Sequence, residues 1–290
     1  MGDFATDTAL EGGDGRYQAV LSPDWEVWGP LGGYVAAIAL RAIGAESPGK
    51  RPASISCQFL AVAAFEAVEV EVVTLRKGKR SHALHVRMSQ RGLPVHAATG
   101  WVVDAGMPGL DHDHAVMPDV PPPAALQSYA ERAENFDDWY PAWHRAIDGR
   151  PVVWVDEPQP PVWRAWMRLL RTPPLDDPFL EAARSLMWMD LGMWNAALQP
   201  HLPWPPSFIA PNLDVTAVFH ASAPDDEWLL CDTAAPVGRD GLVGCSGQVW
   251  TPGGRLVASG NACLFCRPNP QYEQDLQRRR EWETTRREKS

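Results

Sequence analysis

Hydrophobic and polar residues alternate along one segment in the first third of the chain. In residues 67–76 (AVEVEVVTLR), Val68, Val70 and Val72 occupy alternate positions, and Glu69 and Glu71 lie between them. A period of two places the valines on one face of a strand and the glutamates on the other. The segment therefore predicts a strand in an antiparallel sheet with one buried and one partly solvated face.

A different pattern precedes the strands. Residues 35–44 (VAAIALRAIG) are small and apolar and predict a helix, directly after Gly32 and Gly33. A glycine costs a helix or strand about 0.5–1 kcal/mol relative to alanine. The pair therefore indicates that something approaches the backbone closely, either another segment of chain or a ligand. The free N–H groups of a helix start suit a carbonyl oxygen or an anion.

The order of one helix followed by four strands occurs twice. The strands predicted in the first half are 53–60, 67–76, 81–90 and 94–103. In the second half, a helix over 174–198 precedes strands predicted at 212–221, 227–235, 242–250 and 255–266. Two further strands are predicted before that helix, at 151–158 (PVVWVDEP) and 162–170 (VWRAWMRLL). This pattern indicates an internal duplication of an α+β unit.

The region between the repeats, residues 104–126, is dense in Pro, Gly and Asp and has no periodicity, which is typical of a linker. We expect an N-terminal unit over 1–104, a linker over 105–135, a C-terminal unit over 136–270 and a charged tail over 271–290. The tail is predicted to be a solvated or frayed helix.

Composition limits the partners and the compartment. The 290 residues carry a net charge of −10, which argues against nucleic acid or an anionic membrane as the main partner. Five cysteines are spread over the long chain, as in proteins of a reducing compartment, and we expect a cytoplasmic protein. No run approaches 18 apolar residues, so membrane insertion is not expected.

Three short motifs are weak evidence for metal or nucleotide binding. In GAESPGK (44–50), Arg51 replaces the Ser or Thr of a phosphate-binding loop, and the segment follows a helix. DHDH (111–114) lies in the linker without further ligands, and residues three apart in CLFC (263–266) face opposite sides of a strand. We therefore expect no metal and no cofactor.

Several segments resemble acyl-CoA thioesterase II and its relatives, whose fold is a tandem hotdog. LGGYVAAIALRA is similar to the Gly-Gly-led first helix of that family, and Leu75, Arg76 and Gly78 are similar to its Leu-Arg-x-Gly turn. SLMWMDLGMWNAALQPH resembles the second helix with its Asp190-Leu191 step. The resemblance covers about 15–104 and 165–268. It implies an α+β double hotdog in which each helix is wrapped by a curved antiparallel sheet, with the two sheets joined.

The resemblance also implies site residues. In the family, an Asp, a Thr or Ser and a Gln hold the water that attacks the thioester. The Asp corresponds to Asp214, but Pro236 and Ala262 stand at the other two positions. Asn261 is next to Ala262 and is a candidate substrate contact, although strand alternation turns it to the opposite face unless a bulge intervenes. Thr233 and Ser246 are possible substitutes for the missing groups. Gly32 and Gly33 are candidate substrate-binding residues, or only structural ones.

The expected activity is hydrolysis of an acyl thioester, with Asp214 as the catalytic base of a reduced site. The alternative is a non-catalytic acyl-thioester-binding protein. A third class, dehydration, needs a well-placed histidine, and none of His85, His96 and His220 is singled out by the sequence. We expect an acyl-CoA or other acyl-thioester ligand, a pocket lined by tryptophans from 186–204, and a homo-oligomer.

Overall fold

Twelve strands of the protein pair into one antiparallel sheet in the computed structural model, which describes residues 2–133, 142–171 and 175–289. The strand order is β1-β2-β4-β5-β6-β3-β10-β13-β12-β11-β8-β7. The first-half strands are β1 (Glu11–Gly13), β2 (Arg16–Val20), β3 (Arg51–Phe59), β4 (Ala67–Lys77), β5 (Ser81–Gln90) and β6 (Leu93–Val103). The second-half strands are β7 (Ile147–Pro151), β8 (Val162–Leu169), β10 (Asn212–Phe219), β11 (Leu229–Arg239), β12 (Leu242–Trp250) and β13 (Leu256–Phe265). Two short strands, β9 (Phe208–Ile209) and β14 (Arg267–Pro268), pair separately.

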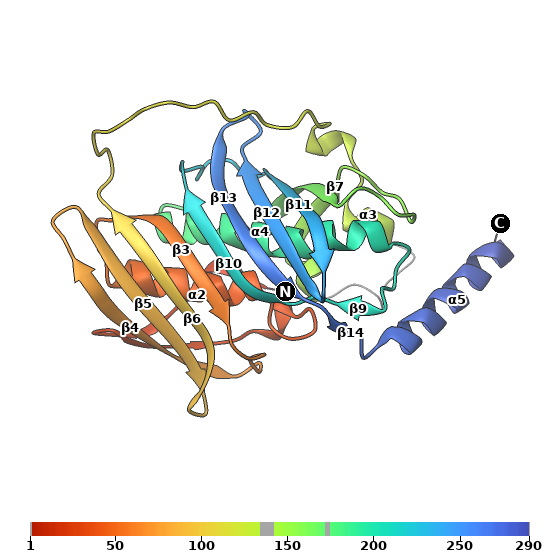
Figure 1. Ribbon diagram of the computed structural model, residues 1–290, viewed down its shortest axis with the longest axis horizontal. Helices are drawn as coiled ribbons and strands as arrows, with labels where there is room; N and C mark the ends of the chain where they lie inside the picture. The colour runs from red at the N-terminus through yellow and green to blue at the C-terminus, as the bar shows by residue number, and fades with distance from the viewer. Residues whose placement is uncertain (1, 134–141, 172–174, 290) are drawn as a thin grey trace.

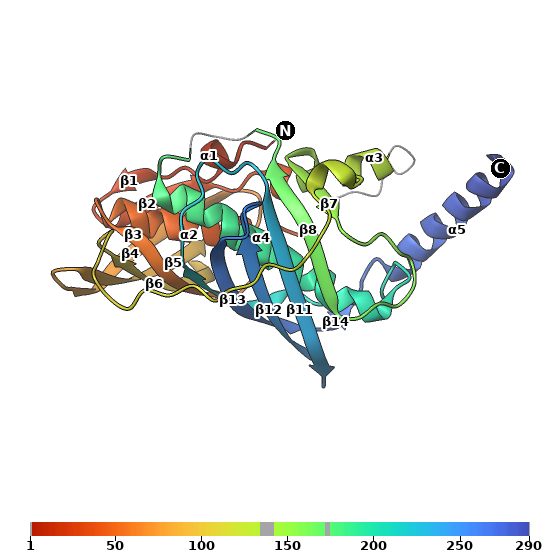
Figure 2. The same cartoon turned by 90° about the horizontal axis from the view of Figure 1, so that it is seen from above.

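The two long helices lie together on one side of this sheet (Figures 1 and 2). They are α2 (Gly32–Ala45) and α4 (Pro178–Leu198), and the shorter or peripheral helices are α1 (Phe4–Asp7), α3 (Tyr129–Ala133) and α5 (Tyr272–Lys289). Helix α4 begins where the Asp177 side chain accepts a hydrogen bond from the Phe179 N–H, with Pro178 in the first turn. Most of its residues are buried, as expected for a helix that is apolar on nearly all sides.

The helices cross closely at two places because glycines leave room there. A methyl group on Gly33 would lie 2.6 Å from the Cα atom of Met187. Near the other end of α2, a methyl group on Gly44 would lie 2.5 Å from the ring of Phe179. The start of α2 therefore packs on the middle of α4, and the end of α2 packs on the start of α4.

The two halves are joined through strands β3 and β10. Val215 pairs with Cys57 and Ala217 pairs with Ile55, and all four side chains are buried under the helices. The hotdog repeat and the continuous antiparallel sheet predicted from the sequence are confirmed. The family-like helices also occupy the predicted positions, but α4 begins at Pro178, so residues 175–177 of the predicted helix are not helical and residue 174 lies outside the described residues.

One predicted strand is wrong. Residues 151–158 were expected to form a strand, but β7 covers Ile147–Pro151 and the chain leaves the sheet after Pro151. Proline has no N–H to donate, so it suits the end of an edge strand, and Pro158, Pro160 and Pro161 follow. The Val and Trp residues of this segment favour a strand, but its prolines end the strand at Pro151.

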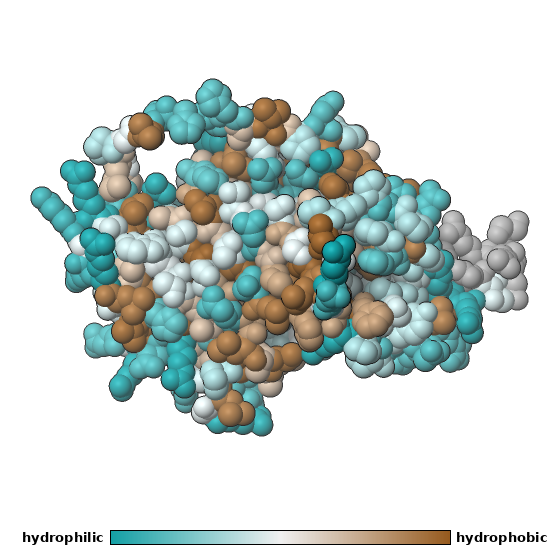
Figure 3. Space-filling view, viewed as in Figure 1, coloured by the Kyte–Doolittle hydropathy of each residue, from teal (hydrophilic) through white to brown (hydrophobic). Residues whose placement is uncertain are grey.

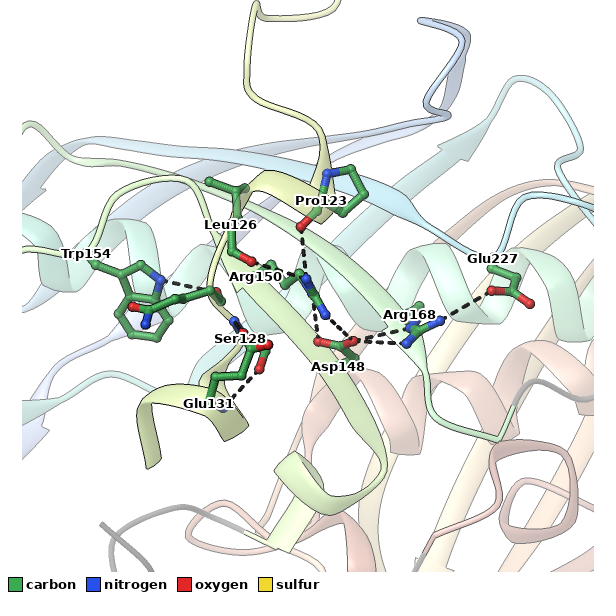
Figure 4. A network of polar contacts seen from close by, with 10 residues as sticks. Pro123, Leu126, Ser128, Glu131, Asp148, Arg150, Trp154, Arg168 and Glu227 are labelled. Atoms are coloured by element: carbon green, nitrogen blue, oxygen red, sulfur yellow. Dashed lines mark hydrogen bonds and ion pairs between the residues drawn. The ribbon is translucent and has the colours of Figure 1, made fainter. Parts of the chain in front are cut away.

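The linker packs on the second half over part of its length. Met117, Val120 and Leu126 lie against the cluster formed by Trp166, Leu230 and Trp250 on the outer face of the sheet. Arg150 also holds this part of the linker, since it donates to the carbonyls of Pro123 at 3.0 Å and Leu126 at 3.2 Å (Figure 4). The predicted boundary at 135/136 lies outside the described residues.

The C-terminal tail is a helix, as predicted, and projects from the body of the protein (Figure 1). Its first half is anchored, because Arg279 donates to the Trp204 carbonyl and, at 2.8 Å, to Asp156. No helix in the described ranges is long and apolar enough to span a membrane.

Candidate active site

Asp190 is a carboxylate buried between the two long helices, with a relative exposure of 5%. Its Oδ2 atom accepts a hydrogen bond of 2.6 Å from the backbone N–H of Gly33, and its Oδ1 atom accepts one from the Asn212 amide. These groups come from α4, the start of α2 and the start of β10. The carboxylate therefore contacts both halves of the chain.

The surroundings of Asp190 change the pKa of its carboxyl group. Burial raises the pKa of this carboxyl from 3.8 to about 6, and the hydrogen bonds from Gly33 and Asn212 oppose the rise. Near neutral pH the group is mostly ionised and is a stronger base than an exposed aspartate. This is the range that suits a general base.

Gly32 lies directly beside this carboxylate. A methyl group on Gly32 would be 2.9 Å from Asp190 Oδ1 and 3.1 Å from Phe59 Cζ. The N–H of Gly32 is at the first position of α2 and has no acceptor among the described residues. An unsatisfied N–H at a helix start can bind an oxygen that gains negative charge. Gly32 thus leaves room beside the carboxylate, and its N–H is a donor without an acceptor among the described residues.

A cavity of about 360 Å³ opens onto Asp190, Gly32 and Asn212. Most of its other walls are apolar, including Trp28 before α2, Val62 after β3 and Val95 on β6. A mostly apolar pocket with a few convergent polar groups is the usual form of a small-molecule site.

A larger cavity of about 770 Å³ lies next to it and shares Trp194 and Ala210 as lining residues. Trp204 also lines the larger cavity. The expectation of tryptophans from 186–204 around a pocket thus fits Trp194 and Trp204. Trp188 is fully buried and lines neither cavity.

Asp214 lies elsewhere on the sheet. It follows a bulge in β10 and shares a face with Thr216 and Val218, opposite the buried Val215 and Ala217. The side chain is half-buried and its Oδ1 atom accepts a 3.0 Å hydrogen bond from the Cys263 N–H. Asp214 does not line either cavity. The outer face that it occupies mixes polar and apolar residues (Figure 3).

Of the other positions taken from the resemblance, Asn261 shares the outer face with Asp214, because it pairs with the neighbouring Thr216. Ala262 is buried opposite Val215, whereas Asn261 is exposed and points to the other face, as strand alternation predicts. Pro236 is exposed at an irregularity of β11. Thr233 is buried, and its hydroxyl donates a 2.9 Å hydrogen bond to the Gly192 carbonyl. This bond links α4 to the sheet. Of the predicted site residues, Gly32 and Gly33 reach Asp190, whereas Asp214 and Asn261 do not.

Sequence reasoning singled out no chemistry at Asp190. The segment MWMDLGMW contains one acidic residue within an otherwise apolar helix, and a carboxylate in such a place is rarely buried without a function or a partner. The single acidic residue in an apolar helix is visible in the sequence. Its hydrogen-bond partner is not, because Gly33 is 157 residues away in the sequence.

The fold and site define a double hotdog protein with a carboxylate and a helix start facing one cavity. The family model of the acyl-CoA thioesterase N-terminal domain matches residues 21–103 of the sequence. The family model of the C-terminal domain matches residues 118–261. The chain belongs to this acyl-CoA thioesterase family.

Solved structures share the fold over nearly the whole chain. A hotdog protein of unknown function from Alicyclobacillus acidocaldarius is 24% identical, with a TM-score of 0.78 and coverage of 92% of this chain and 98% of that one. An acyl-CoA thioesterase II from Mycobacterium marinum is 23% identical, with a TM-score of 0.76 and coverage of 93% and 100%. A tesB protein from Mycobacterium avium subspecies paratuberculosis is 22% identical, with a TM-score of 0.75 and coverage of 91% and 98%. No curated protein matches significantly.

Proposed function

We propose that the chain hydrolyses acyl thioesters in the cavity beside Asp190. The observation that carries the proposal is the buried carboxylate of Asp190, with its raised pKa, next to the N–H of Gly32, for which the described part of the chain offers no acceptor. Membership in the acyl-CoA thioesterase family supports an acyl thioester, such as an acyl-CoA, as the substrate class.

The reaction needs a base for water and a donor for the carbonyl oxygen. Asp190 takes a proton from a water molecule as the water oxygen bonds to the thioester carbon. The N–H of Gly32 at the start of α2 stabilises the negative oxygen of the tetrahedral intermediate. The C–S bond then breaks, and the proton held by Asp190 passes to the departing thiolate, which leaves a free acid and a thiol. Asn212 orients the base through its hydrogen bond.

Asp214 is the rival base that the family resemblance implies. A matched pair of nearly isosteric variants, Asp190→Asn and Asp214→Asn, separates the two. We expect Asp190→Asn to lower the rate of thiol release from a panel of acyl-CoAs by about 10²–10⁴-fold, the usual contribution of a general base. We expect Asp214→Asn to stay within a few-fold of the wild type, because asparagine can still accept the Cys263 N–H.

The opposite result, an inactive Asp214→Asn and an active Asp190→Asn, would assign the base to Asp214. A wild type that releases no thiol from any member of the panel, yet shows quenched tryptophan fluorescence with acyl-CoAs, would support the non-catalytic alternative.

The proposal includes a cytoplasmic homo-oligomer. All five cysteines are free thiols, which suits a reducing compartment. Light scattering of the purified protein tests the assembly, and fractionation of cells that express it tests the compartment.

A further inference from the structure

The outer face of the sheet, on the side away from the helices, has a row of uncharged polar residues through its middle. The strand registers place one residue from each of five neighbouring strands in this row: Thr99 on β6, Ser56 on β3, Thr216 on β10, Asn261 on β13 and Ser246 on β12. The rows on either side of it hold Trp101, Ser54, Val218, Ser259 and Gln248, and Ala97, Gln58, Asp214, Cys263 and Gly244. We call these three rows the central face.

The central face is almost free of charge. It takes three outward positions from each of five strands, and Asp214 is its single acidic residue, without a Lys or Arg. Charged residues are 21% of the chain, so about three of these fifteen positions would be charged at average composition.

Charged side chains begin at the margins of the central face. On one side, Glu71 on β4 and Arg87 on β5 continue one of the rows. On the other side, Gln248 pairs with Asp232 on β11, which binds Arg164 on β8 at 2.8 Å. A neutral centre inside a charged rim is typical of a protein–protein interface.

The central face is open to solvent. Val218 is 47% exposed and Trp101 is 39% exposed, and Asn261 and Ser246 are exposed as well. The linker runs past one end of these strands (Figure 1), and its apolar residues pack farther along the sheet, on β8, β11 and β12. In Figure 3, which looks onto this side of the sheet, strongly hydrophilic residues gather along the left edge and paler residues of intermediate hydropathy lie to their right.

A second copy of this chain is the partner that the central face fits best. The chain carries a net charge of −10, so two copies repel each other unless surfaces with little charge meet. Hydroxyl and amide side chains both donate and accept hydrogen bonds, so the face can pair with itself across a two-fold axis. The side chains of Ser246, Gln248 and Asn261 make no hydrogen bond within the described part of the chain. Without a Lys or Arg, the face does not suit nucleic acid.

The size of the central face also suits a dimer. Five strands about 4.8 Å apart span about 24 Å, and eight residues, the length of β10, span about 27 Å. The resulting area of about 650 Å² lies within the roughly 600–1,000 Å² that each partner contributes to a standard interface. Short side chains such as Ser and Thr permit the spacing of about 10 Å at which sheets pack face to face.

We propose that two copies of the chain pack through their central faces into a two-fold dimer, with Thr216 near the axis. The inference rests on the homo-oligomer of the proposed function and assigns its surface. Thr216 lies in the middle row and on the middle strand of the five. Two-fold packing of the faces therefore brings Thr216 next to its counterpart in the second copy.

A charge at Thr216 tests this surface. Thr216→Glu and Thr216→Lys each place like charges against one another in the dimer, whereas an equal mixture of the two variants places opposite charges there. Gln18→Glu and Gln18→Lys are the matched controls, because Gln18 is exposed on the same side of the sheet but lies on β2, near its far edge. Sedimentation velocity measures the dimer, and native mass spectrometry measures its composition.

We expect a dimeric wild type and a dissociation constant that is higher by about 100-fold or more in each Thr216 variant alone. The mixture should form dimers with one copy of each variant, and both controls should dimerise as the wild type does. Two results would overturn the proposal: single variants that dimerise as tightly as the wild type, or folded variants whose mixture is no more dimeric than either variant alone.

Thr216→Cys replaces the charged variants if urea unfolding shows that they do not fold. Mild oxidation should link two copies of Thr216→Cys through a disulfide, well above the background of the wild type and of Gln18→Cys. Crosslinking of Thr216→Cys at the level of that background would count against the dimer.

Failure of this surface can be told apart from failure of the proposed hydrolysis. Asp190 lies among the helices, on the opposite side of the sheet from Thr216 (Figure 2), so the Thr216 variants should release thiol within a few-fold of the wild-type rate per chain. A wild type that is monomeric at every concentration contradicts the dimer and leaves the hydrolysis untouched. A wild type that releases no thiol, but whose dimer dissociates in the Thr216 variants, contradicts only the hydrolysis and supports the dimer.

Discussion

Asp190 should give the activity a simple dependence on pH. A general base works in its ionised form, and burial raises the pKa of this carboxyl to about 6. We expect kcat/KM to rise as the pH increases through about 6 and to level off above it. A pH–rate profile from 4.5 to 8 with a short-chain acyl-CoA measures this. A plateau that extends down to pH 4.5 would contradict Asp190 as the base.

The same carboxylate should lower the stability of the protein near neutral pH. A folded-state pKa above the unfolded value means that the folded protein holds its proton more tightly, so ionisation at higher pH opposes folding. The cost is present above pH 6 and absent below about pH 4. A shift of about two units corresponds to about 3 kcal/mol. Asp190→Asn should therefore be more stable than the wild type at pH 7.5, by up to that amount.

Urea unfolding at pH 7.5 and pH 4 measures the difference. The advantage of Asp190→Asn should disappear at pH 4, where the wild-type carboxyl is protonated as well. Asp214→Asn is the control, because it exchanges a half-buried carboxylate. An Asp190→Asn variant that is less stable than the wild type at pH 7.5 would show that the ionised form is stabilised in the fold.

At the scale of elements, the two glycines that begin α2 have different roles and should respond differently to alanine. A methyl on Gly33 meets the backbone of Met187 at 2.6 Å, and a backbone contact cannot relax without moving α2 away from α4. We expect Gly33→Ala to lose about 1–3 kcal/mol of stability, the usual cost of overpacking. Gly32→Ala instead meets the Asp190 carboxylate at 2.9 Å, and a side chain can rotate.

Gly32→Ala should therefore lose activity out of proportion to stability. Urea unfolding and kcat/KM of the two variants, measured side by side, give the comparison. Equal losses of stability in both variants would contradict this distinction.

The elements themselves were largely predictable because each depends on local sequence. Alternation along 67–76 and the apolar helix over 35–44 correspond to β4 and α2. The segment 151–158 failed because its prolines determine where the edge strand ends. The candidate site was only partly predictable. The glycine pair was visible as an anomaly, but its partner depends on how α2 crosses α4, and no local pattern encodes that crossing.

At the scale of the whole molecule, the two halves should not need their covalent connection once folded. They share the β3–β10 pairing, and Gly33 and Asp190 meet across them. Residues 105–116 of the linker are exposed. We expect a protease site inserted at Leu110, which is 99% exposed, to give a nicked protein whose two pieces elute together and keep their thioesterase rate. Separation of the pieces without denaturant would contradict this view of the interface.

We expect the contact of Phe179 with Gly44 to limit each chain to one proposed site. A duplicated fold offers two places where the start of one long helix packs on the other long helix. The first holds Gly33 and Asp190, whereas at the second a phenylalanine ring lies against Gly44. The approximate symmetry of the repeat relates these two positions, but only the first has an acidic side chain beside a helix-start N–H. Titration with a non-hydrolysable thioether analogue of an acyl-CoA should accordingly saturate at one molecule per chain. A stoichiometry of two would show that both positions bind the analogue.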